Sequence, residues 1–324
     1  MISGGVGAAR FLRGLLAEVP AGHVSAVVNV GDDCTVHGLD VSPDLDTITY
    51  TLAGAIDPER GWGLVDETWT AIEQVRHYAR SAGVDEHRAP GDDAAGWFAL
   101  GDRDLGTHLY RTSRRRAGVP LSAVTAEVVA AWGLELALLP ASDDPVRTVL
   151  DTADGRSLSF QQYFVRERHA VEVRAVRIEG AGAARPGPGV LEAISAADVV
   201  VVAPSNPIVS IDPVLAVPGV RDAVADRRDR VVAVSPIVDG AALKGPADRL
   251  LRELGHEPTV VGIARWVAPI AATLVVDRAD GHLAERVEAA GVRCVVTDTV
   301  MSSPGVAAAL ARTCLDQAAS PEAT

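Results

Sequence analysis

DVVVVAPSNP, residues 198–207, joins four consecutive valines to a turn of small polar residues and prolines. A continuous apolar run that ends in turn residues is typical of a strand covered on both faces in a parallel sheet. Five further runs have this character, and segments with apolar residues at helical spacing lie between them. The runs are residues 24–30, 134–140, 230–236, 272–277 and 292–297, and the predicted helices are residues 7–18, 66–80, 121–132, 189–196, 245–254, 280–290 and 304–318. The alternation predicts an α/β fold, with a doubly wound, mostly parallel, Rossmann-like sheet.

Two segments depart from this rhythm. Residues 43–132 are largely helical in pattern, whereas residues 146–179 alternate like antiparallel strands around a turn at Asp154–Gly155. We therefore expect a single α/β domain over residues 1–324, with an inserted, mainly helical lobe at about 43–132 and an edge β-hairpin at about 146–179.

Composition excludes several classes of protein. Hydrophobic residues make up 48% and charged residues 23% of the 324, which is typical of a soluble globular protein. A net charge of −13 argues against a nucleic-acid partner, which would need a basic face. The three cysteines are odd in number and far apart, so a reducing compartment is expected. With no signal-peptide layout and no long apolar stretch, we expect a cytoplasmic protein without a membrane partner.

Acidic side chains accumulate near the predicted strand 24–30. From residue 14 to residue 59 there are eight carboxylates and no Lys or Arg, and Asp32 and Asp33 follow the strand directly. Carboxylates at the carboxyl end of a parallel strand lie where such sheets bind ligands, and a hard divalent cation is their usual partner. With Asp44 and Asp46 nearby, we favour a metal ion or a substrate hydroxyl as the partner of this cluster.

A helix is predicted to begin beside this cluster. Ser42 suits the N-cap, Pro43 the first helical position, and Gly54 the C-terminal stop. Asp44 and Asp46 then fall in the first turn, where they could simply complement the helix dipole. That alternative stays open beside the ligand role.

Glycines and small polar residues mark two candidate nucleotide-binding turns. Gly4, Gly5 and Gly7 lead into an amphipathic helix, whose exposed amides would attract phosphate. A glycine turn that only caps the helix explains them equally well. The second candidate turn follows the valine run and consists of Ser205, Asn206 and Pro207. It lies at the ligand edge of the predicted sheet, although it could be no more than a tight turn.

Two basic residues stand out from the rest. Lys244 is the only lysine among thirty basic residues, and a compact ammonium suits a phosphate oxygen. It could also be an ordinary exposed residue. Arg103, between Asp102 and Asp104, could form a surface ion pair or set its planar guanidinium against a ring or a phosphate. The three arginines at 114–116 point in different directions on a helix and are expected to be solvated.

Taken in order, eight segments resemble the 2-phospho-L-lactate transferase family of coenzyme F-420 biosynthesis, whose actinobacterial members act as phosphoenolpyruvate transferases. The segments are SGGVGAARFLRGL (3–15), VVNVGDD (27–33), SPDLDTITYTLAG (42–54), LGDRDLGTH (100–108), LPASDDPVRT (139–148), APSNPIVSI (203–211), VVAVSPIV (231–238) and KGPADRL (244–250). Each is weak alone, but their order along most of the chain is specific. Compared with the family, the N-terminus is expected to lack a residue or more of the first strand.

The resemblance implies a reaction and a set of site residues. The phosphoenolpyruvyl or phospholactyl group would pass from a GDP-activated donor to the ribityl hydroxyl of the deazaflavin Fo, releasing GMP, with Mg²⁺ required. Asp46 and Arg103 match the family's Fo contacts, and Asp46 would position or deprotonate the hydroxyl. The remaining predicted roles are metal binding by Asp32, Asp33 and Asp44 and nucleotide binding by Gly4, Gly5, Gly7, Ser205, Asn206, Pro207 and Lys244. A homodimer is implied, and the arginine-rich composition favours the actinobacterial donor, enolpyruvate.

Two other functions compete with this one. A non-catalytic regulator that binds a nucleotide or a sugar phosphate could use the same fold, because fold does not settle function. The GDRD and SPDLD segments speak against it, since a sensor needs no deazaflavin pocket. A nicotinamide-dependent oxidoreductase is disfavoured because no G-x-G-x-x-G follows a full strand.

Overall fold

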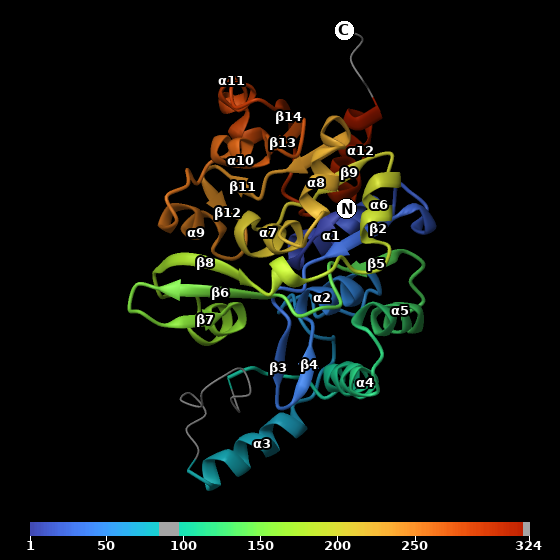
Figure 1. The fold of residues 1–324 in the computed structure, drawn as a ribbon, viewed down its shortest axis with the longest axis vertical. Helices are drawn as coiled ribbons and strands as arrows, with labels where there is room; N and C mark the ends of the chain where they lie inside the picture. Colours follow the sequence, from blue (N-terminus) through green and yellow to red (C-terminus); the bar gives the residue numbers. More distant parts are fainter. Residues whose placement is uncertain (84–96, 320–324) are drawn as a thin grey trace.

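A seven-stranded parallel sheet forms the centre of the protein. The computed structural model describes residues 1–83 and 97–319 (Figure 1). The strand order is β14-β13-β10-β9-β1-β2-β5, and every pairing is parallel. The strands are β1 Ile2–Ser3, β2 Ser25–Val28, β5 Ala137–Pro140, β9 Val200–Val202, β10 Val231–Val234, β13 Thr273–Asp277 and β14 Arg293–Thr297. Each apolar run predicted to be a strand contains one of them, so the α/β fold is confirmed.

The order of the strands reverses at β1. After β1 the chain adds β2 and β5 on one side, then crosses to place β9, β10, β13 and β14 on the other. Such a reversal opens a crevice at the carboxyl ends of the two central strands, which is where open α/β sheets bind ligands. Gly4 follows β1 at this point, and the turn at 203–206 follows β9. The topology therefore places both candidate nucleotide-binding turns at the switch point.

Helices flank the central sheet (Figure 1). In the C-terminal half they are α6 Val190–Ala196, α7 Asp212–Leu215, α8 Val220–Ala225, α9 Ala247–Glu253, α10 Val260–Val267, α11 Ala284–Glu288 and α12 Pro304–Ala319, with a short hairpin of β11 Ile237–Val238 and β12 Ala241–Ala242. At the N-terminus, α1 Gly5–Leu15 packs against α12. Strands β9 and β10 are buried along their whole length, which is what their uninterrupted valines predict. Among the described residues, no helix combines the length and apolarity needed to cross a bilayer.

Four helices lie within the predicted insertion at 43–132. They are α2 Pro43–Leu52, α3 Thr70–Ser81, α4 Asp104–Arg116 and α5 Leu121–Ala131, while residues 84–96 of this segment lie outside the described residues. A hairpin of β3 Cys34–Val36 and β4 Leu39–Val41 precedes them and was not predicted. Its turn, His37–Gly38, has two residues at positive φ. Figure 1 shows α3, α4 and this hairpin at the end of the molecule away from the C-terminus.

The predicted edge hairpin at 146–179 is instead a separate three-stranded sheet. Strands β6 Arg147–Thr152, β7 Ser157–Ser159 and β8 Val173–Glu179 pair antiparallel in the order β7-β6-β8, with Gly155 at positive φ in the predicted turn. Because β6 has a neighbour on each side, its backbone is satisfied without the central sheet. The antiparallel strands and their turn agree with the prediction, and the structure adds a third strand, β8, that the hairpin did not include. Figure 1 shows this sheet between α9 and the β3–β4 hairpin.

Candidate active site

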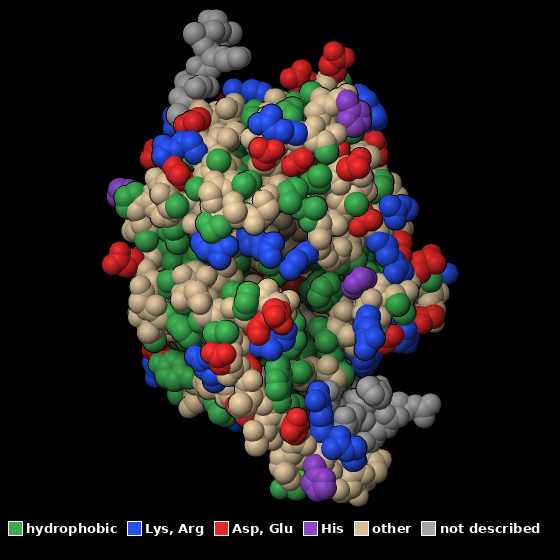
Figure 2. Space-filling view, turned by 180° about the vertical axis from the view of Figure 1, so that it is seen from behind, with side chains coloured by type: hydrophobic (Ala, Val, Ile, Leu, Met, Phe, Trp, Pro, Cys, Tyr) green, Lys and Arg blue, Asp and Glu red, His purple; other side chains and the backbone are tan. Residues whose placement is uncertain are grey.

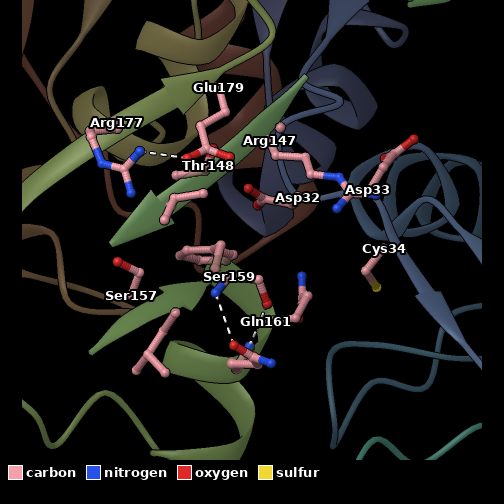
Figure 3. Close-up of a pocket in the computed structure, with 15 residues that line it drawn as sticks. Asp32, Asp33, Cys34, Arg147, Thr148, Ser157, Ser159, Gln161, Arg177 and Glu179 are labelled. Atoms are coloured by element: carbon pink, nitrogen blue, oxygen red, sulfur yellow. Dashed lines mark hydrogen bonds and ion pairs between the residues drawn. The ribbon is translucent and has the colours of Figure 1, made fainter. Parts of the chain in front are cut away.

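A cavity of about 360 Å³ lies where the loop after β2 meets the three-stranded sheet. Residues 31–34 form one wall, and residues from β6, β7 and β8 form the other, together with residues 160–162 (Figure 3). Asp32 and Asp33 both line it, so the structure brings these two predicted metal ligands to one pocket. The loop begins at the carboxyl end of β2, beside the switch point of the central sheet.

Backbone contacts hold the loop against β6. The Thr148 amide donates to the Gly31 carbonyl at 2.8 Å, and a Cβ added to Gly31 would lie 2.5 Å from Thr148 Oγ1. The buried Asn29 side chain fixes the other side of the loop, because its Oδ1 accepts from the Gly31 amide at 2.7 Å while its Nδ2 donates to Asp44 at 3.0 Å. Residue 31 must therefore be glycine for Asp32 and Asp33 to reach the cavity.

Three buried polar atoms of the cavity residues have no hydrogen-bond partner among the described residues. They are Asp32 Oδ1, Asp33 Oδ1 and Thr148 Oγ1. Folded proteins satisfy nearly all buried polar atoms, so each exception calls for an explanation. Three exceptions around one cavity indicate that a polar ligand, an ion or ordered water completes the site.

Burial opposes ionisation of the acidic residues here. Burial raises the pKa of Asp33 to about 8, although a hydrogen bond from Ser42 and the charge of Arg111 act in the opposite direction. Burial likewise raises the pKa of Asp44 to about 6, against hydrogen bonds from Asn29 and the Gly5 amide. Burial and then the Asp44 charge raise the pKa of Asp32 well above its usual range. A cation beside these groups would restore their ionised forms.

The donors present fit a magnesium ion that is only partly held by protein. Within residues 1–83 and 97–319, no three His, Cys, Asp or Glu side chains are arranged to hold a metal ion by themselves. Mg²⁺ commonly takes one or two carboxylates and completes its shell with waters and substrate phosphates. Asp32 and Asp33, each with an unpartnered oxygen, suit that arrangement. Asp44 is engaged by Asn29 and Gly5, and metal binding by all three aspartates stays a prediction.

Asp46, the predicted catalytic residue, does not line the cavity. Its two carboxylate oxygens accept from the two terminal nitrogens of Arg111, with Nη1 at 3.1 Å from Oδ2. His108 lies beside this pair, with Nδ1 3.8 Å from Asp46 Oδ2 and Nε2 3.2 Å from Asp104 Oδ1. Sequence reasoning missed Arg111, although its spacing from Asp104 and His108 puts all three on one face of α4.

Arg103, the predicted deazaflavin contact, is exposed at the start of α4. Its Nη1 donates to the Val65 carbonyl at 2.5 Å, and its amide donates to Glu67 at 2.8 Å. Asp102 accepts from Thr68 and from two amides at the start of α3 instead of pairing with Arg103. Helix α4 thus begins beside Arg103 and carries Arg111, the partner of Asp46. The shared role of Arg103 and Asp46 in binding Fo stays a prediction.

The first candidate turn is occupied by protein groups. The Asp44 carboxylate lies at the start of α1, where it accepts from the Gly5 amide, and a Cβ on Gly4 would come within 2.8 Å of it. A Cβ on Gly7 would lie 2.3 Å from the Pro204 carbonyl oxygen. These glycines therefore allow close packing at the switch point, and nucleotide binding by them stays a prediction.

The second candidate turn is also internally bonded. Ser205 Oγ donates to the Gly4 carbonyl at 2.6 Å, and Asn206 Oδ1 accepts from the Ile208 amide at 3.0 Å, which caps the turn of helix that begins at Pro207. Lys244 is exposed, with Nζ 3.5 Å from where a side chain at Gly61 would begin. None of these four residues lines the cavity described above, and their predicted contact with nucleotide is untested.

Arg147 is a cavity residue that the sequence analysis does not single out. It is the first residue of β6 and one of twenty-nine arginines, so residue type gave no signal. Only its position in an alternating segment, two residues after Pro145, could have drawn attention. Thr148 was missed for the same reason, since nothing in the sequence shows that its hydroxyl is left without a partner.

Comparison with known proteins gives a consistent result. The model of the 2-phospho-L-lactate transferase CofD family matches residues 1–314. The phosphoenolpyruvate transferase of Streptomyces griseus subsp. griseus is 45% identical over 322 residues, covering 98% of this chain and 97% of that protein. The phosphoenolpyruvate transferase of Kitasatospora aureofaciens is 44% identical over 319 residues, covering 97% of this chain and 95% of that protein. A crystal structure of a Bacillus halodurans protein, 18% identical, superposes with a TM-score of 0.62 over 97% of this chain and 98% of its own, which shows a shared fold.

Proposed function

This chain belongs to the 2-phospho-L-lactate transferase CofD family, and we propose that it transfers a phosphoenolpyruvyl group from a GDP-activated donor to the terminal ribityl hydroxyl of the deazaflavin Fo, with release of GMP. The product would be dehydro coenzyme F-420-0. The 2-phospholactyl donor is the alternative, but the similar proteins from Streptomyces, Kitasatospora and Nocardia are all named phosphoenolpyruvate transferases. Membership of a transferase family also favours an enzyme over the non-catalytic regulator.

The observation that carries the proposal is the cavity with its unpartnered acidic oxygens. Asp32 and Asp33 each present a buried oxygen without a partner, and burial raises the pKa of both carboxyls. In their ionised forms these carboxylates would repel a diphosphate unless a cation lay between them. Asp32 and Asp33 would hold Mg²⁺, which would offset the charge of the diphosphate and of the oxygen that leaves.

The reaction itself is a displacement at phosphorus. The ribityl oxygen forms a bond to the phosphorus that carries the enolpyruvyl group, while the bond from that phosphorus to the GMP phosphate breaks. The hydroxyl proton passes to a carboxylate or to water. Because such transfers depend mostly on positioning and charge, the chain's main tasks are to fix the two substrates and exclude competing water.

Asp46 is proposed to position the attacking hydroxyl. Both of its oxygens already accept from Arg111, which fixes their direction and restricts the side chain to one rotamer. A carboxylate held in this way retains lone pairs that can accept from one further hydroxyl. Arg111 would therefore act as the positioning residue for Asp46.

Basic groups are available for the polyphosphate despite the net charge of −13. Figure 2 shows a hollow in one face of the molecule, with Lys and Arg side chains gathered along its edge. Local placement of a few cations is how an acidic protein can hold a phosphate ligand, and a charged cleft also raises the rate of substrate encounter.

The experiment that tests the proposal is mass spectrometry of the product formed from Fo and each activated donor, with and without Mg²⁺. We expect a mass increase on Fo that matches the enolpyruvyl phosphate, equimolar GMP, and no product in chelator. Formation of product only from the phospholactyl donor would correct the donor assignment. Absence of product from both donors with Mg²⁺ present would overturn the proposed function.

A further inference from the structure

The cavity contains one cation that none of the described residues neutralises. Arg147 lines the cavity from the first position of β6, and its side chain extends toward Asp33 (Figure 3). It makes no side-chain hydrogen bond or ion pair with any residue in 1–83 or 97–319. Arg147 is exposed and its guanidinium is always charged, so water hydrates it in the free protein and the group stays open to an anionic ligand.

Neighbouring charges do not supply that anion. Glu179 is the direct cross-strand partner of Arg147, yet it accepts from Arg177 at 2.5 Å. Arg177 also bonds Asp151 at 2.7 Å, so the second arginine of the cavity is already paired with two carboxylates. Asp33 accepts from Ser42 at 2.8 Å and is influenced by the charge of Arg111. Arg147 therefore differs from Arg177 in being available to a ligand.

A second unsatisfied group stands next to Arg147. Thr148 Oγ1 is buried and has no partner among the described residues, although the Thr148 residue is held in place by its backbone bond to Gly31. Successive residues of a strand point to opposite faces, and the Thr148 hydroxyl lies against Gly31. Thr148 therefore anchors the start of β6 to the loop at 31–34, and the Arg147 guanidinium is the group that can donate two parallel bonds to an anion.

We propose that Arg147 binds the carboxylate of the three-carbon acid that is transferred. This rests on the proposed function, whose donor carries two anionic parts. The diphosphate would be served by the cation at Asp32 and Asp33. The carboxylate of the three-carbon acid takes no part in the displacement, so it needs a counter-charge away from the cation at the diphosphate. Arginine suits this role because its planar guanidinium can donate two parallel hydrogen bonds to a carboxylate.

The size of the cavity agrees with this assignment. At about 360 Å³ it lies near the lower end of the range for small-molecule pockets, so it suits a phosphorylated three-carbon acid better than an entire nucleotide or deazaflavin. The nucleotide and the deazaflavin would then extend away from the cavity on either side. Arg147 would give specificity for donors that carry an acid group on the transferred unit.

The test compares two probes on the same variants in the presence of Mg²⁺. Calorimetric titrations would measure two probes, the donor in which the 2-oxygen of lactate is joined to the terminal phosphate of GDP, and GDP itself, which lacks the carboxylate, against the wild type, Arg147→Gln and Arg147→Lys. Loss of a charge-assisted bond should weaken donor binding by about 10- to 100-fold in Arg147→Gln, and GDP binding by less than about 3-fold. Arg147→Lys should lie between, because an ammonium keeps the charge but loses the fork.

Arg174→Gln is the matched control. Arg174 is an exposed arginine of β8 in the same three-stranded sheet, but it does not line the cavity. It should bind both probes as the wild type does. If Arg147→Gln weakens the binding of the donor and of GDP equally, Arg147 contacts the diphosphate and the proposal is overturned. Unchanged binding of both probes would also overturn it.

A fragment comparison separates this proposal from the proposed function. Free phosphoenolpyruvate and inorganic phosphate differ by the acid group, and neither requires transfer to occur. The wild type should bind phosphoenolpyruvate more tightly than phosphate, and Arg147→Gln should abolish most of that difference. If the difference persists in Arg147→Gln, the proposal fails even in an active enzyme. If wild-type protein forms no product yet shows the difference, only the proposed function fails.

Discussion

Arg111 and Asp46 form a bidentate ion pair that is buried between α4 and α2. The Arg111 guanidinium also lies 3.4 Å from the Asp40 carbonyl, so it links the helical segment to the β3–β4 hairpin. The Asp46 charge raises the pKa of Arg111 even though burial acts to lower it. This pair is one of several contacts between the acidic region and α4, and it neutralises one of the five aspartates between residues 29 and 47.

Removing either partner should be costly. Asp46→Asn or Arg111→Met leaves one buried charge unpaired, so we expect each to lower the free energy of unfolding by about 3–5 kcal/mol in urea titrations. The double variant Asp46→Leu/Arg111→Met should recover most of that loss, because an apolar pair replaces a buried ionic one. If the two losses of unfolding free energy simply add in the double variant, Asp46 and Arg111 are not energetically coupled, and the prediction is wrong.

The same variants test the role of Asp46 in transfer. If Asp46 positions the ribityl hydroxyl, the double variant should fold and still have a much lower kcat, with little change in the KM of the nucleotide donor. A double variant with restored stability and wild-type kcat would show that the pair is only structural. Circular dichroism at the assay temperature provides the control for folding.

The fold was largely predictable, because parallel strands buried on both faces need continuous apolar runs, and β9 and β10 consist of such runs. The β3–β4 hairpin was not predictable. Its His37–Gly38 turn lies within an acidic segment, and the charges of that segment are equally typical of a ligand site. The third strand of the antiparallel sheet was not predicted, because alternation shows that strands exist and not which strands they pair with.

The candidate site was predicted in part. Asp32 and Asp33 could be recognised because charge without compensation is visible in a sequence. Arg111 and Arg147 could not, because only the fold shows that one is buried against Asp46 and the other lacks a partner. The glycines illustrate a different limit: Gly4 and Gly7 allow close packing against Asp44 and Pro204, and a sequence cannot distinguish that need from a phosphate cradle.

Magnesium should reverse the order of stability between the wild type and Asp33→Asn. Burial raises the pKa of the Asp33 carboxyl to about 8, so between the unfolded value of about 4 and pH 8 folding takes up a proton, and stability falls as the pH rises through this range. In metal-free buffer at pH 8, Asp33→Asn should therefore unfold at a higher temperature than the wild type.

With Mg²⁺ and GDP, the wild type should gain stability by mass action, and Asp32→Asn and Asp33→Asn should gain much less. The measurement is thermal unfolding over a magnesium titration. Asp229→Asn, at a carboxylate that is 95% exposed, is the control and should follow the wild type. Equal magnesium responses in all four proteins would rule out Asp32 and Asp33 as ligands.

Gly7→Ala should destabilise the switch point. The new Cβ would lie 2.3 Å from the Pro204 carbonyl oxygen, and a backbone atom cannot move aside as a flexible side chain can. We expect a loss of about 1–3 kcal/mol in urea titrations. Gly106→Ala in α4 is the matched control, because nothing lies within 4 Å of its added Cβ and alanine favours a helix by up to about 1 kcal/mol. A wild-type stability for Gly7→Ala would contradict the close packing.

Asp104 should stabilise the protein at neutral pH and lose that effect in acid. Burial acts to raise its pKa, but hydrogen bonds and charge from His108, the hydrogen bond from Tyr50 and the charge of Arg111 outweigh burial, so the net shift is downward. A carboxyl whose folded pKa is depressed contributes stability that is fully present above the unfolded pKa, near 4, and that disappears as the pH falls through the folded value.

Urea titrations of the wild type and Asp104→Asn between pH 3 and pH 7 would measure this contribution. The wild type should be more stable by about 1–3 kcal/mol at pH 7, where the variant leaves Tyr50 and His108 without their charged partner. The difference should narrow below about pH 4, because the wild-type carboxyl then takes up its proton and loses the ionic contact. Asp229→Asn should show no such narrowing, since its carboxylate is almost fully exposed. A gap between wild type and Asp104→Asn that stays constant across this pH range would mean that Asp104 stabilises the fold through packing, and that its charge contributes nothing.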